Sequence, residues 1–148
     1  MLTLETKNRE VVDLMNGLLN VQNLEGKKFS LVVSKNIKII QDGLAHIEEA
    51  AKPSEEFIEL SKKANTLNND QEAIGKLEEE NAELVKSRKD QLAEVDKMLE
   101  GDIKIELHSI AEDILPERIT AAQVTALSKL KEKWKYLKTI TLGMKKQL

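Results

Sequence analysis

The feature that most constrains the fold is a regular apolar stripe between residues 33 and 51. Apolar residues recur there at alternating steps of four and three: Val33, Ile37, Ile40, Leu44, Ile47 and Ala51. This spacing puts them on one face of a helix and is typical of a coiled-coil seam. Because such a face is stable only when another element covers it, we expect a long helix that packs against a partner helix.

A second long helix is expected over residues 71–100. Pro53 ends the first stripe, since proline removes a helical donor and clashes with the preceding turn. Asp70 can then cap the next helix, and Gly101 follows its end. The apolar stripe of this second helix is weaker than that of residues 33–51, because it contains three polar residues: Asn81, Arg88 and Gln91. The two stretches together predict a long antiparallel helical hairpin.

Two short segments alternate apolar and polar residues, as half-buried strands do. They are Leu2–Thr6 and Ile103–His108, and we expect them to pair. A helix over residues 7–20 and another that begins at a capping box on Thr120 flank them. The predicted fold class is mainly α, with a long coiled-coil-like antiparallel helical hairpin, a small two-stranded antiparallel sheet and flanking helices.

Charge divides the chain unevenly. The 148 residues have a net charge of −3, with 33% charged and only 3% aromatic residues. Residues 129–148 contain seven lysines and one glutamate, a net +6, so residues 1–128 carry −9. We therefore expect a single helical-hairpin domain over residues 1–128 and a basic C-terminal helix or tail over residues 129–148.

The composition argues against catalysis. The chain has no cysteine, and its histidines are His46 and His108, which leaves few residues for a metal centre or an activated nucleophile. The glycines are scattered, so no phosphate-binding loop is present. Acids such as Glu78–Glu80 diverge around a helix and are typical of a solvated face. We expect no enzyme activity, no metal and no cofactor.

No membrane or export segment is expected either. The apolar runs are too short to span a bilayer, and residues 1–10 have no apolar stretch of signal-peptide length. These patterns predict a soluble, intracellular protein.

Two sets of residues are candidates for binding. The seam residues Val33, Ile37, Ile40, Leu44 and Ile47 are the candidate interface of a homo-oligomer, because two such stripes exceed what one partner helix covers.

The second set lies in the basic tail and consists of Lys131, Lys133, Trp134, Lys135 and Tyr136. Lysines beside aromatic residues can bind a small phosphorylated ligand or an acidic protein surface. A helix docked on the body through Trp134 and Leu137 explains the same composition. Duplex nucleic acid is disfavoured, since the body's charge of −9 would repel a long polyanion.

Several short sequences carry a family resemblance: Gly26-Lys27-Lys28-Phe29-Ser30, Ser34-Lys35-Asn36-Ile37-Lys38, Ile103–Ile110, Leu115-Pro116 and Ile119–Gln123. With the order of elements over residues 1–130, they resemble a group of small uncharacterised proteins of tailed bacteriophages. The lysine-rich end departs from that pattern. The resemblance implies a phage origin and a place in the host bacterial cytoplasm, and it assigns no functional residues.

Elimination leaves a non-enzymatic binding protein. The first hypothesis is an inhibitor or sponge that antagonises a bacterial antiviral defence system by binding a host protein or a nucleotide signal. The alternative is a virion assembly factor, such as a tail chaperone, or a structural protein of the virion.

Overall fold

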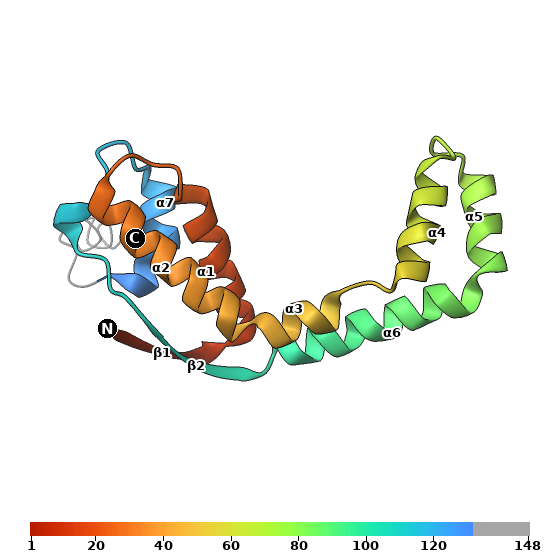
Figure 1. The fold of residues 1–148 in the computed structure, drawn as a ribbon, viewed down its shortest axis with the longest axis horizontal. Coiled ribbons are helices and arrows are strands. Elements are labelled where there is room, and N and C mark those ends of the chain that lie inside the picture. The colour runs from red at the N-terminus through yellow and green to blue at the C-terminus, as the bar shows by residue number, and fades with distance from the viewer. Residues whose placement is uncertain (132–148) are drawn as a thin grey trace, which may run out of the picture. The chain divides into compact units, whose positions relative to one another are not determined.

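The structure is a computed structural model and describes residues 1–131. The described residues are mainly helical with a small two-stranded antiparallel sheet, which confirms the predicted fold class (Figure 1). The helices and strands are β1 (Leu2–Lys7), α1 (Asn8–Val21), α2 (Lys27–Gly43), α3 (Ala45–Ala51), α4 (Glu55–Asn65), α5 (Gln71–Glu80), α6 (Ala82–Leu99), β2 (Asp102–Leu107) and α7 (Ala121–Ala126).

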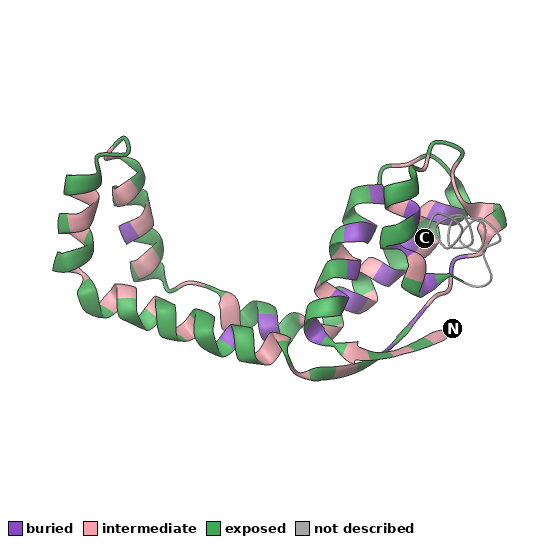
Figure 2. Cartoon of the chain, turned by 180° about the vertical axis from the view of Figure 1, so that it is seen from behind, coloured by how far each residue is buried: buried purple, intermediate pink, exposed green. Residues whose placement is uncertain are grey.

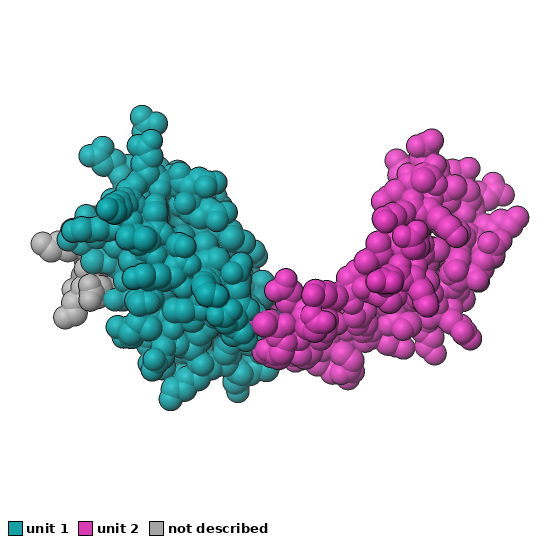
Figure 3. Space-filling view, in the orientation of Figure 1, with its two compact units in different colours: residues 1–44, 101–148 teal, residues 45–100 magenta. Residues whose placement is uncertain are grey.

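The chain forms two compact units (Figure 3). Of the described residues, unit 1 comprises 1–44 and 101–131, and unit 2 comprises 45–100. This division differs from the single domain expected over residues 1–128. Residues on both sides of position 128 belong to unit 1: Leu130 is fully buried, and its carbonyl accepts a hydrogen bond from the amide of Ile110 at 2.7 Å.

The sheet of unit 1 joins the two strands that the alternation predicts. β1 and β2 pair antiparallel, with Leu2 opposite Leu107 and Thr6 opposite Ile103. On β2 the side chains of Ile105 and Leu107 are buried, whereas Lys104 and Glu106 are exposed. The two-residue period therefore identified both the strands and the face that packs on the core.

Helices α1, α2 and α7 pack with this sheet into one apolar core. On α1 the buried residues recur every three or four positions, at Val11, Leu14, Leu18 and Val21. Helix α7 lies close to α1, since a Cβ added to Gly17 would lie 3.2 Å from the Cβ of Ala126. The predicted capping box on Thr120 begins α7.

A buried amide fastens α2 to the end of β2. Asn36 is fully buried, and its Nδ2 donates to the carbonyl of His108 at 2.9 Å. Its Oδ1 accepts from the backbone N–H of the same residue at 2.8 Å. Both backbone polar groups of the half-buried His108 are therefore satisfied, and no donor is left without a partner where the strand ends.

The seam predicted for self-association is divided between the two units. Helix α2 ends at Gly43, so Val33, Ile37 and Ile40 lie on α2, Leu44 lies between the helices, and Ile47 lies on α3. Val33 and Ile40 are buried in the core of unit 1, with Ile37 and Leu44 packed at its margin. Ile47 is buried on α3 in unit 2.

Val33, Ile40 and Ile47 are thus buried within their own chain, whereas Ile37 and Leu44 are half-buried. Residues of α1 and β2 belong to the same apolar core as Val33 and Ile40. The homo-oligomer expected through these five residues stays a prediction.

In unit 2, α3 and α4 pack against α6, and a loop over residues 66–70 joins α4 to α5 (Figure 1). Pro53 separates α3 from α4, as predicted. Ser54 and Asp70 cap α4 and α5 through bonds from the amides of Phe57 and Ala73. The expected single helix over residues 71–100 is interrupted at Asn81.

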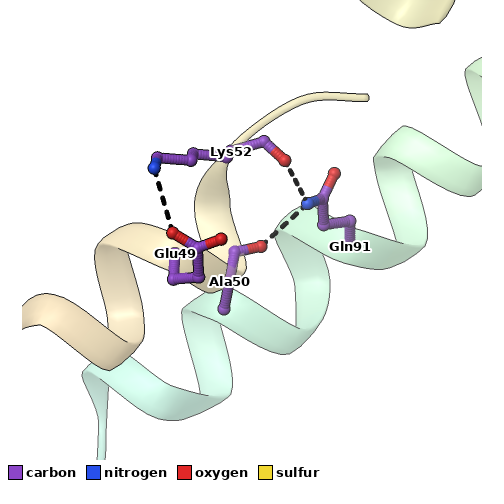
Figure 4. Close-up of polar contacts among 4 residues, drawn as sticks. All are labelled: Glu49, Ala50, Lys52 and Gln91. Carbon is purple, nitrogen blue, oxygen red and sulfur yellow. Dashed lines mark hydrogen bonds and ion pairs between the residues drawn. The ribbon is translucent and has the colours of Figure 1, made fainter. Parts of the chain in front are cut away.

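Two of the polar residues on the predicted second stripe donate hydrogen bonds to backbone carbonyls at the end of α3. Gln91 Nε2 donates to the carbonyls of Ala50 at 2.8 Å and Lys52 at 2.6 Å (Figure 4). Arg88 Nη1 donates to the carbonyl of Ala51 at 2.7 Å, and its guanidinium lies 5.6 Å from the centre of the Phe57 ring. Helix ends leave carbonyls without partners, and α6 supplies those partners here.

Candidate protein-binding groove

A groove of about 840 Å³ lies in unit 2 between α4 and the junction of α5 with α6. Five glutamates, Glu56, Glu59, Glu79, Glu80 and Glu83, contribute to its lining. Leu60, Ala82 and Leu84 supply apolar surface, and Lys63, Asn81 and Ser87 complete the wall. The groove thus combines acidic side chains with apolar ones.

Local sequence signals create this groove. On α4, residues 56, 59, 60 and 63 share one face, because positions three and four apart are neighbours on a helix. On the opposite side, Asn81 ends α5: its amide bonds to the carbonyl of Glu78 and its Nδ2 donates to that of Leu77 at 2.9 Å. The break at Asn81 brings residues 79–84 into one wall.

Most of the groove's acids form no ion pair with another described residue. Glu59 forms an ion pair with Lys62, with 3.4 Å between Nζ and Oε1. Within residues 1–131, no ion-pair partner is found for the other four, which are Glu56, Glu79, Glu80 and Glu83. With Lys63 as the sole base in the lining, the groove carries a net charge of −4. Its field favours a cationic ligand.

The apolar residues of unit 2 are incompletely covered. Among the described residues, α5 has no buried side chain, and α4 and α6 have one each, Leu60 and Val95 (Figure 2). Ile58 and Leu92 are 40% and 43% exposed. Helices with half-covered apolar positions beside an open groove are typical of surfaces that bind another protein.

The lysine-rich candidate site lies mostly outside the described residues. Lys131 is described and exposed, and it forms an isolated bridge with Ile110. Lys133, Trp134, Lys135 and Tyr136 fall outside the described range. The proposed ligand for this set stays a prediction.

The two histidines lie apart from the groove. His46 is exposed on α3, and His108 is half-buried next to Asn36. Within residues 1–131, no group of three or more histidines, cysteines or acids is placed to hold a metal ion. In the same range, no helix is both long and apolar enough to cross a membrane.

Sequence reasoning missed the groove because it treated the acids around residues 78–83 as a solvated face. A signal was available at Asn81, a poor helix former within an otherwise helical stretch of acids. A second signal was the spacing of Glu56, Glu59 and Lys63 on one face of α4. Neither could show that the two faces meet.

Comparison of the chain with protein families, with curated proteins and with solved structures found no match.

Proposed function

We propose that the protein is a non-enzymatic binding protein whose groove in unit 2 accepts a basic segment of another protein. The observation that carries the proposal is the groove itself, where four glutamates without an ion-pair partner among residues 1–131 lie beside Leu60 and Leu84. The acids select a partner rich in lysine or arginine and speed the encounter. The leucines and the exposed Ile58 offer apolar contact, which provides most of the energy at protein interfaces.

The charge of the groove supports one of the two expected kinds of target over the other. A nucleotide signal carries phosphates, which would meet a net charge of −4 and be repelled at distances below about 8 Å at physiological ionic strength. A protein target avoids this cost by presenting lysines. We therefore propose a host protein, rather than a nucleotide, as the partner.

The biological role rests on the resemblance to phage proteins. On that basis we propose that the target belongs to a bacterial antiviral defence system and that the groove inhibits it by covering a basic surface. A virion assembly factor would use the same groove on a virion protein, and the identity of the partner separates the two roles.

Affinity capture from a lysate of infected host bacteria tests the proposal with three forms of the full chain. These are the wild type, a groove variant and a control variant. The groove variant carries Glu79→Gln, Glu80→Gln and Glu83→Gln. The control carries Glu48→Gln, Glu72→Gln and Glu94→Gln, which change the same charge in unit 2 outside the groove.

We expect a host protein that the wild type and the control retain and that the groove variant loses. Purified partner should then bind the groove variant at least about tenfold more weakly, the change that 1.4 kcal/mol produces. Equal capture by all three forms would exclude the groove as the binding site.

A further inference from the structure

We infer that the open edge of β1 pairs with β1 of a second copy of this chain, and that the two strands run antiparallel about Leu4. Within residues 1–131 the sheet consists of β1 and β2, so β1 has a neighbouring strand on one side alone. An edge strand of this kind presents backbone donors and acceptors to another chain. The edge belongs to unit 1 and shares no residue with the groove of unit 2.

The register of the sheet determines which backbone groups of β1 face this edge. The amide of Asn8 donates to the carbonyl of Gly101 at 2.9 Å, and these two residues continue the register of the sheet. In an antiparallel ladder, residues that bond to the neighbouring strand alternate with residues that do not. The backbone groups of Thr3 and Glu5 therefore point away from β2. Within residues 1–131, no other segment forms a hydrogen bond to them.

Pairing about Leu4 joins these outward groups without a contact between like charges. Thr3 then lies opposite Glu5 of the second copy, and each such pair exchanges two backbone hydrogen bonds. A shift by two residues in one direction would place the two copies of Glu5 opposite each other, which charge repulsion disfavours. The opposite shift shortens the paired stretch, because β1 begins at Leu2. Lys104 of β2 lies 3.5 Å from Glu5 and offsets its charge.

The apolar face of the sheet continues across this pair. Leu2 and Leu4 are half-buried at the margin of the core, on the face that carries Ile105 and Leu107. The two copies of Leu4 lie opposite each other at a position without backbone hydrogen bonds, where side chains approach most closely. Each copy thus covers apolar surface that the other leaves half-exposed. A second copy supplies this alternation by symmetry, which favours it over a segment of an unrelated protein.

The symmetry of the pair allows a crosslinking test, because the chain has no cysteine of its own. In Leu4→Cys the two sulfurs meet at the centre of the pair, where Cα atoms about 4.5 Å apart suit a disulfide. Thr6→Cys is the matched control, since Thr6 is also half-buried on the same face of β1. Its two copies are four residues apart along the strands, about 13 Å. We expect mild oxidation to crosslink Leu4→Cys and to leave Thr6→Cys monomeric.

Thr3→Pro tests the backbone hydrogen bonds of the pair. Proline removes the outward N–H and is tolerated where that N–H faces solvent, so pairing with β2 should persist. Sedimentation equilibrium at concentrations up to about 1 mM should show a dimer of the wild type, weakened at least about tenfold by Thr3→Pro. Thr3→Ala keeps the N–H and should dimerise as the wild type does. Circular dichroism verifies that each variant is folded.

Three results would overturn the inference. The first is a wild type that stays monomeric over the whole concentration range. The second is equal dimerisation of Thr3→Pro and Thr3→Ala, which would place the interface elsewhere. The third is equal crosslinking of Leu4→Cys and Thr6→Cys, which would exclude the register about Leu4. None of these results bears on the groove, whose binding is tested by the glutamate variants above.

Discussion

The two units of this chain are stabilised in different ways. Unit 1 gathers its core from segments far apart in the sequence, with buried residues on α1, α2, β2 and α7. Unit 2 consists of helices that follow one another along the chain, and its described residues bury Ile47, Leu60 and Val95. Instead of a large core it has side-chain caps at Ser54 and Asp70 and the contacts from Arg88 and Gln91.

This difference predicts that the two units open at different free-energy cost. Burial of apolar side chains is the dominant stabilising contribution in a folded domain, so unit 1 should open rarely. Capping interactions contribute about 1 kcal/mol each, so α4 and α5 should open locally at lower cost. Binding surfaces are commonly drawn from such regions, because they can adapt to a partner.

The largest effect is expected from a charge placed in the core of unit 1. Ile40 is fully buried, and Ile40→Asp would put an unpaired carboxylate among apolar side chains. Burying an unpaired charge is among the changes that cost more than about 4 kcal/mol. Because whole domains are stable by about 5–15 kcal/mol, we expect a variant that is largely unfolded at 37 °C, as measured by circular dichroism.

Leu31→Asp is the matched control, since Leu31 lies on the same helix and is 51% exposed. Its melting curve should stay close to that of the wild type. If both variants melt together, the burial assigned to α2 is wrong.

The second effect concerns the buried amide of unit 1. Asn36→Ala removes the hydrogen-bond partners of both the N–H and the C=O of the half-buried His108. Each unsatisfied buried group costs about 1–3 kcal/mol, and the partial exposure of His108 keeps the sum near its lower end, so urea denaturation should show a loss of roughly 2 kcal/mol. Asn16→Ala, at an exposed position of α1, should change stability little. Equal losses in both variants would contradict the role of the amide.

The elements that the sequence predicted well depend on local signals. The strand period, the break at Pro53, and the caps at Asp70 and Thr120 each depend on residues within a few positions of one another. The close approach of β2 to Gly43, at the end of α2, depends on a distant residue instead. A Cβ added there would lie 3.3 Å from Cδ1 of Ile105 on β2, and no periodicity along α2 reveals that neighbour.

The candidate site was the least predictable part for the same reason. The apolar seam was interpreted as an interface, because its period alone does not say whether β2, α1 or a second copy covers it. The polar residues Arg88 and Gln91 were interpreted as weak points of a stripe, although they bond to the end of α3. In each case the correct interpretation depends on which residues are neighbours in the folded chain. The spacing of residues along the sequence does not give that information.

A third prediction tests the independence of the two units. Arg88→Met removes the donor to the Ala51 carbonyl and the cation over Phe57. A lost hydrogen bond from a charged group costs about 1.5–3 kcal/mol, and partial exposure should hold the effect near the lower figure. Hydrogen exchange should show about a tenfold loss of protection in α3, as 1.4 kcal/mol implies, and no change in α1.

Lys89→Met is the control, since Lys89 is the exposed neighbour of Arg88 on α6. It should leave the exchange of α3 as in the wild type. If Arg88→Met speeds exchange in α1 as much as in α3, the units unfold together and the comparison between them fails.

The smallest effect is expected at Lys52, where α3 ends. A hydrogen bond to Glu49 and the charge of that residue raise the pKa of Lys52 above its ordinary value of 10.5, and the charge of Glu48 adds to this. The Lys52 Nζ lies 3.0 Å from Glu49 Oε2 (Figure 4). Because the pKa is raised in the folded chain, the pair stabilises unit 2 fully below the pKa of the unfolded chain. This contribution is lost as the pH rises through the folded pKa.

An NMR titration of the Lys52 side chain should therefore show a lower midpoint in Glu49→Gln than in the wild type. The stability difference between the wild type and Lys52→Gln should also shrink as the pH rises above 10.5. An unchanged midpoint in Glu49→Gln would show that the pair does not persist in solution, which is the usual fate of a fully exposed ion pair.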